Sequence, residues 1–456
     1  MLEIAVLPGK GRGYRATEDI TAGTTIHVSE PLTTTVSQEW IPETCFWCFN
    51  FSYPKKQKFK AVSTREEQLE LSNQWLSSKE DGYTSKGSVT HAVQQLASTL
   101  VFKDILFCSE TCREEFKRSG LSTPFEWYMT MAANYRLDNE FKRNKLKETN
   151  LIQNQLKDEE IMIIESLDIH DDKALSDWLD EAWSCIVDND FELYREIDDT
   201  DRAMCRLIAS CIIRKDAELY PCNDNLPPLP RFKDLLAIQN NELSHFRSCF
   251  INPKNELYPS HDNQKSISSS LLLPCIQHII KLGPKERREL LLSVLPLEVL
   301  DVMALYSFFA RAFKDTHVTK KNSIKIPTLA NLDHRLFRSI YFRERANSFG
   351  LWEMSHDHTD VTDDLELLGW GIYPSAVYFN HSCDANVIKI RDGRKMKFIA
   401  KRMIKKGEEA CISYGNVEED VENRRSRLLK HYHFLCQCTR CIQEDEQNNN
   451  NKRSNC

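Results

Sequence analysis

The stretch that decides the fold runs over residues 371–386 and reads GIYPSAVYFNHSCDAN. Its apolar part ends at four side chains that can hydrogen-bond or bind a metal: Asn380, His381, Ser382 and Cys383. Further along, residues 407–415 read GEEACISYG, a polar turn and a short strand that ends at Tyr414. Functional groups are often placed where strands end in loops, so these two segments are the first candidates for a site.

Short strand patterns flank these segments and recur at the other end of the chain. Residues 387–392 (VIKIRD), a turn at 392–394 (DGR) and residues 395–401 (KMKFIAK) predict a β-hairpin. The first 35 residues also read as strands, with a glycine-rich turn at residues 9–13. Neither β-unit can bury a core alone, so we expect the two ends of the chain to pack together.

The middle of the chain has helical periodicity. Between residues 124 and 345 apolar residues recur at helical spacing, as in DKALSDWLDEAWSCIV at residues 172–187. This pattern predicts a large helical region inserted between the two β-units. The expected fold class is therefore α+β.

The composition indicates an intracellular protein with a mildly acidic surface. The 456 residues carry a net charge of −7, which argues against direct nucleic-acid binding through phosphate contacts and suits a basic protein partner. The N-terminus lacks a signal-peptide core, and the most apolar stretch, residues 290–313, contains three charged side chains. We therefore expect no membrane association, a location in the nucleus, the cytoplasm or both, and a monomer.

The 16 cysteines include groups at the spacing of metal ligands. A reducing compartment disfavours a disulfide framework, and a closed structural zinc site takes four ligands in a tetrahedron. The plainer alternative is that these are reduced cysteines without a metal. The groups are Cys45-x-x-Cys48, Cys108-x-x-x-Cys112 and Cys436-x-Cys438-x-x-Cys441.

Taken in order, these motifs resemble the SET domain, in particular that of the SET and MYND (SMYD) family and its fungal relatives. NHSC, a Gly-Glu-Glu turn, a strand that ends in tyrosine and Cys-x-Cys-x-x-Cys follow one another as in that family. The earlier segment GRG at residues 11–13 resembles the first SET motif, and NSF at 347–349 resembles the second. Residues 424–441, RRSRLLKHYHFLCQCTRC, resemble the post-SET segment.

The resemblance implies a fold and an activity. The NHSC strand would be threaded beneath the loop that carries the tyrosine. The chain would act as an S-adenosylmethionine-dependent protein-lysine N-methyltransferase on a histone or non-histone protein substrate with a target lysine. Tyr414 would be the catalytic residue. The residues implied to contact the cofactor S-adenosylmethionine are Arg12, Asn347, Asn380, His381, Tyr414, Tyr432 and Phe434.

The resemblance also implies two zinc sites. Cys383 would be the fourth ligand beside the three post-SET cysteines, Cys436, Cys438 and Cys441. Cys45, Cys48, Cys108 and Cys112 would share the other zinc, as the first and third ligand pairs of a MYND finger do. The chain departs from the MYND pattern because it has no cysteine between Cys48 and Cys108 and no Cys/His pair that closes the module. We therefore expect an incomplete finger without the second MYND zinc.

These expectations divide the chain into six segments. They are an N-terminal part of the SET domain (1–40), a MYND-like zinc-finger segment with an insertion (41–123), a helical insertion (124–345), a C-terminal catalytic part of the SET domain (346–435), a post-SET zinc segment (436–445) and a disordered tail (446–456).

Two other functions stay open at this stage. The first is a catalytically inactive SET and zinc-finger module that binds proteins, which the large insertions and the incomplete finger favour. The second is a zinc-dependent nucleic-acid binder, which the acidic balance and the lack of a basic, aromatic face disfavour. Glu408 and Glu409 are interpreted as a solvated turn without a catalytic role.

Overall fold

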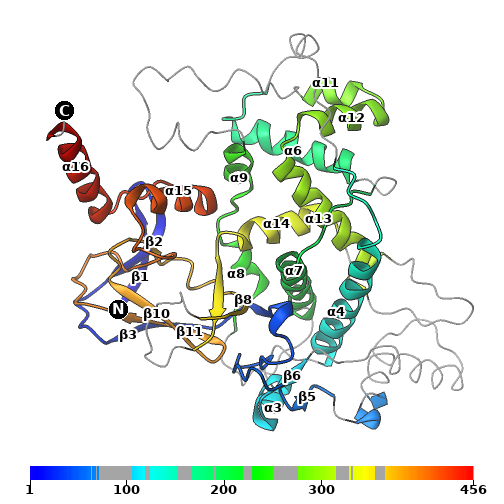
Figure 1. Cartoon of the computed structure of the whole chain (residues 1–456), viewed down its shortest axis with the longest axis horizontal. Coiled ribbons are helices and arrows are strands. Elements are labelled where there is room, and N and C mark those ends of the chain that lie inside the picture. Colours follow the sequence, from blue (N-terminus) through cyan, green and yellow to red (C-terminus); the bar gives the residue numbers. More distant parts are fainter. Residues whose placement is uncertain are drawn as a thin grey trace, which may run out of the picture.

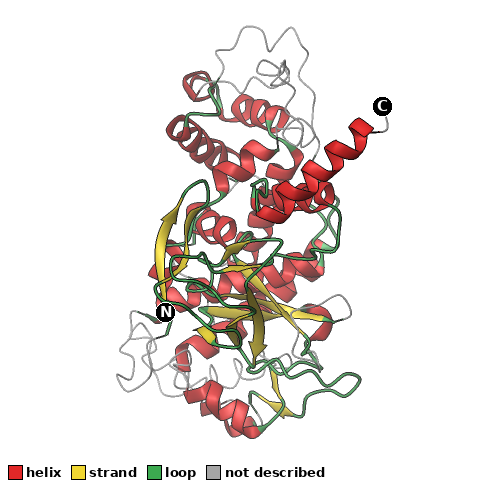
Figure 2. Cartoon of the chain, turned by 90° about the vertical axis from the view of Figure 1, so that its left-hand side faces the viewer, coloured by secondary structure: helices red, strands yellow, loops and turns green. Residues whose placement is uncertain are grey.

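The computed structural model describes residues 1–62, 64–67, 69–70, 105–118, 124–151, 167–187, 192–218, 229–249, 276–314, 328–329, 332–354 and 365–454. The strands gather on one side of the molecule and most helices on the other (Figure 1), and in the view from the strand side the strands lie in front of many of the helices (Figure 2). The predicted α+β class is confirmed.

Strands from the two ends of the chain share sheets, as predicted. One sheet has the order β4 (Thr33–Val36), β8 (Leu367–Ile372) and β7 (Ser348–Trp352). Another has the order β10 (Val387–Asp392), β11 (Lys395–Ala400) and β3 (Thr25–Ser29), so the predicted hairpin at residues 387–401 is confirmed. Each sheet joins one N-terminal strand to two C-terminal strands. Figure 1 shows the blue N-terminal strands among the orange C-terminal ones.

The first hairpin reaches into the C-terminal part of the chain. It consists of β1 (Leu2–Leu7) and β2 (Gly11–Ala16), paired antiparallel. The glycine-rich segment differs from the predicted turn over residues 9–13, because residues 11–13 already belong to β2. On its flanks the Tyr14 amide donates to the Tyr378 carbonyl (2.8 Å), and the Ala410 amide donates to the Tyr14 carbonyl (2.9 Å). Strand β2 is thereby held between two segments that lie hundreds of residues away in sequence.

Two very short strands lie side by side at the centre of the C-terminal unit. Strand β9 (Asn380–His381) pairs in parallel with β12 (Cys411–Ile412). The Ser382 amide continues the ladder by donating to the Ile412 carbonyl at 3.0 Å. Next to this pair of strands, Phe379 and Phe398 stack with ring centroids 4.2 Å apart in the core of the β-unit.

The helical region forms most of a second core, which also includes Leu32, Phe107 and Ile372 from outside that region. Helix α13 is buried over most of its length, which explains why its sequence is apolar on nearly all sides. Asp171, Asp198 and Asp333 begin α6, α7 and α14 by accepting hydrogen bonds from first-turn amides. The described helices of this region are α4 (Pro124–Asn144), α6 (Asp172–Ile186), α7 (Asp199–Ala217), α8 (Phe232–Leu236), α9 (Glu242–Ser248), α11 (Ile276–Lys281), α12 (Pro284–Val294), α13 (Leu297–Phe313) and α14 (His334–Glu344).

A small unit lies beneath the helices and next to the β-sheets. It contains the 3-10 turn η1 (Gln38–Trp40), β5 (Phe59–Lys60), β6 (Leu106–Phe107) and α3 (Glu110–Arg118). Residues 71–104, the middle of the predicted finger insertion, lie outside the described residues. Within the part of the chain that the structure describes, no helix is both long enough and apolar enough to cross a membrane.

The C-terminal segment differs from the prediction. Instead of a disordered tail from residue 446, helix α15 (Val421–Tyr432) is followed by α16 (Thr439–Ser454). An ion pair at the start of α16 holds it against α15: Glu444 accepts from Arg424 of α15 at 2.6 Å. Within α16, Glu444 also accepts from Arg440 at 2.7 Å. The composition offered nothing to bury, but charged side chains anchored beside a cysteine cluster are enough to continue a helix.

A substitution at Gly369 tests the packing of β4 against β8. A Cβ atom at this position would lie 2.0 Å from the Thr35 carbonyl oxygen, which belongs to rigid backbone. We expect Gly369→Ala to lower the free energy of unfolding by about 1–3 kcal/mol, the usual cost of overpacking a core. Denaturant unfolding followed by circular dichroism measures it. Gly283→Ala is the control because its nearest neighbour is a movable glutamate side chain; equal losses in both variants would contradict the packing described.

Candidate active site

The pairing of β9 with β12 places Tyr414 against His381. The Tyr414 amide donates to Nδ1 of His381 at 3.1 Å, and the Tyr414 hydroxyl donates to the Phe379 carbonyl at 2.9 Å. Burial raises the pKa of Tyr414 well above its usual value, with a smaller contribution from Tyr432. The phenol therefore stays protonated near neutral pH and is fixed in one orientation.

His381 is neutral and fully engaged within the protein. Burial lowers the pKa of its imidazole to about 4. Because Nδ1 accepts from the Tyr414 amide, Nε2 carries the proton and donates toward Cys383 Sγ, 3.2 Å away. Both ring nitrogens thus have protein partners, so any contact of His381 with a cofactor falls to its backbone.

Aromatic rings from the C-terminal segment surround Tyr414. The Tyr432 ring lies 4.7 Å from it between centroids, and the Phe434 ring lies 6.4 Å away. Phe434 is also 6.2 Å from the imidazole of His381. The end of α15 and the segment that follows it therefore bring two aromatic rings close to Tyr414.

A cavity of about 410 Å³ opens beside Tyr414. Three of the predicted site residues line it, namely Asn347, Tyr414 and Tyr432. The sequence reading missed most of the rest of the wall, including Phe349 within the recognised NSF motif. Strand periodicity could have flagged aromatic residues here but not the direction they face. The missed aromatic and charged lining residues are Phe349, Trp352, Trp370, Phe379, Arg345, Lys389 and Glu418.

A second group of predicted residues gathers on β2 and β9, outside the lining of that cavity. The side-chain amide of Asn380 reaches toward the Arg12 carbonyl at 3.5 Å. Glycine at position 13 makes this approach possible, because a Cβ atom there would lie 2.4 Å from Nδ2 of Asn380 and would push that side chain away. The structure thus brings Arg12 beside Asn380, and it lines the 410 Å³ cavity with neither of them nor with His381 or Phe434.

The side chains of Arg12 and Asn347 bond to backbone carbonyls. The Arg12 guanidinium donates to the Ala237 carbonyl at 2.6 Å, at the end of α8, and lies 5.3 Å from the Tyr378 ring centroid. The Asn347 amide donates to the Arg343 carbonyl at 2.8 Å, at the end of α14. Both residues therefore connect the β-unit to the helical region, which spacing along the chain did not suggest.

Glu409 has a larger part than the predicted solvated turn. Its carboxylate accepts from Nδ2 of Asn380 at 2.9 Å and pairs with Lys10 at 2.6 Å, with its side chain only 18% exposed. Glu408 accepts from the Asn386 amide at 3.0 Å. A Gly-Glu-Glu turn is usually exposed to solvent, and only the approach of β2 and β9 gives these carboxylates polar partners.

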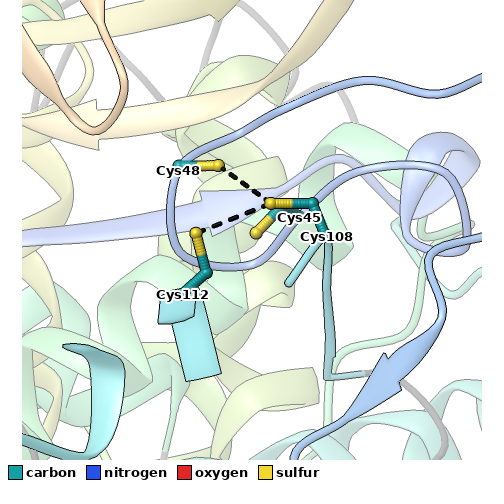
Figure 3. Close-up of side chains that lie close together, drawn as sticks. All are labelled: Cys45, Cys48, Cys108 and Cys112. Atoms are coloured by element: carbon teal, nitrogen blue, oxygen red, sulfur yellow. Dashed lines mark hydrogen bonds between the residues drawn. The ribbon is translucent and has the colours of Figure 1, made fainter. Parts of the chain in front are cut away.

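The first cysteine group comes together from two distant loops. The sulfurs of Cys45, Cys48, Cys108 and Cys112 lie within 4.8 Å of one another and point inward (Figure 3). Cys108 Sγ is 3.6 Å from Cys48 and 3.5 Å from Cys112. A hydrogen bond from Cys48 lowers the pKa of Cys45 to about 5.

The second group joins β9 to the segment after α15. The sulfurs of Cys383, Cys436, Cys438 and Cys441 also lie within 4.8 Å of one another. Cys383 Sγ is 3.5 Å from Cys441 and 3.9 Å from Cys436. Hydrogen bonds from the neighbouring thiols lower the pKa of Cys438, and Arg424 donates to Cys441 Sγ at 3.5 Å. A thiolate therefore has both hydrogen-bond donors and a nearby positive charge.

Both groups fit zinc by the chemistry of their donors. Zinc–sulfur bonds of about 2.3 Å in a tetrahedron put the sulfurs roughly 3.8 Å apart. The sulfur–sulfur distances of 3.5–3.9 Å come close to that spacing. Among the described residues, these are the two groups of side chains gathered closely enough to hold a metal ion.

The chain matches a known protein family and several known proteins. A family model described as the SET domain matches residues 11–415. A potential protein lysine methyltransferase, SET6, of Saccharomyces cerevisiae is 40% identical over 110 residues, which are 24% of this chain and 28% of that protein. A SET and MYND domain-containing protein of Dictyostelium discoideum is 35% identical over 120 residues, 26% of this chain and 28% of that protein.

A mammalian protein is similar over the same extent. The histone-lysine N-methyltransferase SMYD3 of Mus musculus is 35% identical over 104 residues, 22% of this chain and 24% of that protein. Each alignment thus spans roughly a quarter of the relative's length.

Metal analysis tests the two cysteine groups. We expect the purified chain to carry two zinc ions, and Cys441→Ser to carry one, because a tetrahedral site that loses a thiolate binds zinc far more weakly. Plasma mass spectrometry against protein concentration gives the ratio. Cys185→Ser is the control, since Cys185 lies outside both groups and should leave two ions bound. An unchanged ratio in Cys441→Ser would rule out the second site.

Proposed function

The chain belongs to the SET-domain family, and from this premise we propose that it transfers a methyl group from S-adenosylmethionine to the side-chain amine of a lysine in a protein. The family match and the relatives named as lysine methyltransferases support a methyltransferase function. The donor, the protein substrate and the roles of individual residues are the finer part of the proposal.

One observation carries the proposal: a fixed, protonated tyrosine hydroxyl stands beside a cavity walled by aromatic rings. The Tyr414 hydroxyl donates a hydrogen bond to the Phe379 carbonyl, so the lone pairs of its oxygen are free to accept from an incoming amine. A hydrogen bond from the amine N–H to the Tyr414 oxygen points the nitrogen lone pair in a defined direction. Methyl transfer needs this alignment because the nitrogen must attack in line with the breaking bond.

The aromatic wall suits the acceptor. A free lysine has a pKa near 10.4, so the amine must lose its proton before it can attack. Enclosure by the rings of Phe349, Trp352 and Tyr432 disfavours the charged ammonium and so lowers the pKa of a bound lysine. The site therefore needs alignment and a poorly solvating channel more than it needs a strong base.

The residues on β2 and β9 fit the donor. When bound, S-adenosylmethionine supplies a methyl group on a positively charged sulfonium. Lys10 and Arg12 would hold its carboxylate, while Glu409 and Asn380 would hold its amino group. The glycine at position 13 leaves room for the Asn380 side chain to lie against β2. Phe434 offers an aromatic face for the adenine, beside the post-SET cysteines.

Removal of one oxygen atom tests the role of Tyr414. We expect Tyr414→Phe to slow methyl transfer at least about 100-fold, because the transition state loses a preorganised polar contact. Donor binding should be essentially unchanged, because the ring remains. Transfer from labelled S-adenosylmethionine to cellular proteins gives the rate, and calorimetry gives donor affinity.

Tyr306→Phe serves as the control, since Tyr306 is a buried tyrosine in α13 outside the cavity lining. Wild-type rates in Tyr414→Phe would remove the assigned role. Absence of donor binding to the unmodified chain would instead favour the alternative of an inactive interaction module.

The rate should also depend on pH in a defined way. Between pH 7 and 9 we expect methyl transfer to rise steadily, because a growing share of the acceptor amine is neutral. Tyr414 has a pKa raised by burial and His381 one of about 4, so neither changes its charge in this range. Initial rates at saturating donor measure the profile. A falling limb below pH 9 would mean that the phenol ionises there, contrary to its environment in the structure.

A further inference from the structure

The first cysteine group is packed against the hairpin of β10 and β11. The Arg394 guanidinium lies 3.8 Å from the centroid of the Trp47 ring, between Cys45 and Cys48 in sequence. A Cβ atom at Gly393 would lie 3.9 Å from that of Cys48. The turn of the hairpin therefore rests on the loop that carries two of the four thiols.

Arg391 connects this loop to the wall of the cavity. Its Nη1 donates to the Cys48 carbonyl at 3.0 Å and to the Gly393 carbonyl at 3.0 Å. Its Nε donates to the Trp352 carbonyl at 2.8 Å. One planar guanidinium thus spans a carbonyl beside a thiol ligand and a carbonyl in strand β7.

The contact falls at a weak point of β7. This strand is at the edge of its sheet, and its pairing with β8 shifts register between Leu351 and Trp352. A bulge interrupts the ladder, so backbone groups there need other partners. Trp352 lines the 410 Å³ cavity, and its indole lies against Gly350, which also lines it. The outer wall of the cavity is therefore anchored by Arg391.

We propose that the four-cysteine group Cys45, Cys48, Cys108 and Cys112 sets the position of the acceptor wall through Arg391, which makes Arg391 a positioning residue. Metal bound by the four thiols fixes the Cys48 loop, the loop fixes the guanidinium, and the guanidinium fixes the Trp352 carbonyl. Loss of this metal loosens β7 and weakens use of the acceptor, while the residues on β2 and β9 keep their places. The inference rests on the proposed function for its kinetic consequence alone.

Hydrogen exchange of the full chain tests the structural step without any need for activity. Arg391→Lys keeps the charge, but a single ammonium cannot reproduce the fork that reaches two separated carbonyls. Cys112→Ser removes a thiol that comes from α3 and not from the Cys48 loop, and zinc analysis should show one ion in place of two. We expect each variant to speed amide exchange at residues 348–352 several-fold and to leave residues 379–383 unchanged.

The double variant separates coupling from independent damage. If the four-cysteine group acts through Arg391, Arg391→Lys with Cys112→Ser exchanges at residues 348–352 no faster than Arg391→Lys alone. Lys397→Ala is the matched control, because Lys397 is exposed on the same hairpin and pairs with Asp392. Additive effects, or no effect of Cys112→Ser at residues 348–352, would overturn the proposal.

Two further arms keep the test decisive. Should Cys112→Ser unfold the chain, as judged by exchange across α7, Arg391→Lys decides alone: unchanged exchange at residues 348–352 overturns the anchoring role. In kinetics, Arg391→Lys should raise KM for the acceptor about tenfold, the change expected from one lost charge-assisted hydrogen bond, with donor Kd unchanged. A chain without activity would refute the proposed function and leave the exchange result standing.

Discussion

The parallel pairing of β9 with β12, with β2 held along its flank, is the constraint on which the rest of the structure depends. Strands β9 and β12 are too short to persist alone, because an isolated ladder of two residues cannot compensate for the loss of chain entropy. They persist because buried backbone groups of three distant segments find partners only in one another. Tyr414, His381 and Asn380 take their positions directly from this arrangement.

The two cysteine groups are attached to different parts of the β-unit. Cys383 lies just after β9, so the second group connects the β9–β12 pair to α15 and α16. It also brings Tyr432 and Phe434 close to Tyr414. His381 belongs to both systems, since one ring nitrogen accepts from the Tyr414 amide and the other donates to the Cys383 sulfur. The first group instead supports the hairpin of β10 and β11 and, through Arg391, the edge strand β7.

The helical region is more than an insertion that the β-unit tolerates. Arg12 donates to a carbonyl at the end of α8, and Asn347 donates to one at the end of α14. Arg343 in α14 donates to the Ile238 carbonyl at 3.0 Å, so both contacts converge on the same part of the helical core. The segments that carry Arg12 and Asn347 are thereby attached to a large, well-packed body, which limits how far they can move.

Local pattern was sufficient for the α+β class, the family, the hairpin at residues 387–401 and the pairing of each Cys-x-x-Cys-type group, because these depend on residues close together in the chain. The order of motifs added the meeting of Arg12 with Asn380 and of Cys383 with the post-SET cysteines, by resemblance. The segment boundaries and the roles of single residues stay predictions. Other features that depend on distant segments could not be foreseen: Glu409 bonds Asn380, and Trp352 and Trp370 line the cavity. The continuation of α16 past residue 446 was not foreseen either. Periodicity states which side chains share a face of an element, but which partner that face meets is settled only when the chain folds back on itself, since the free energy of such contacts belongs to pairs of segments and not to either one.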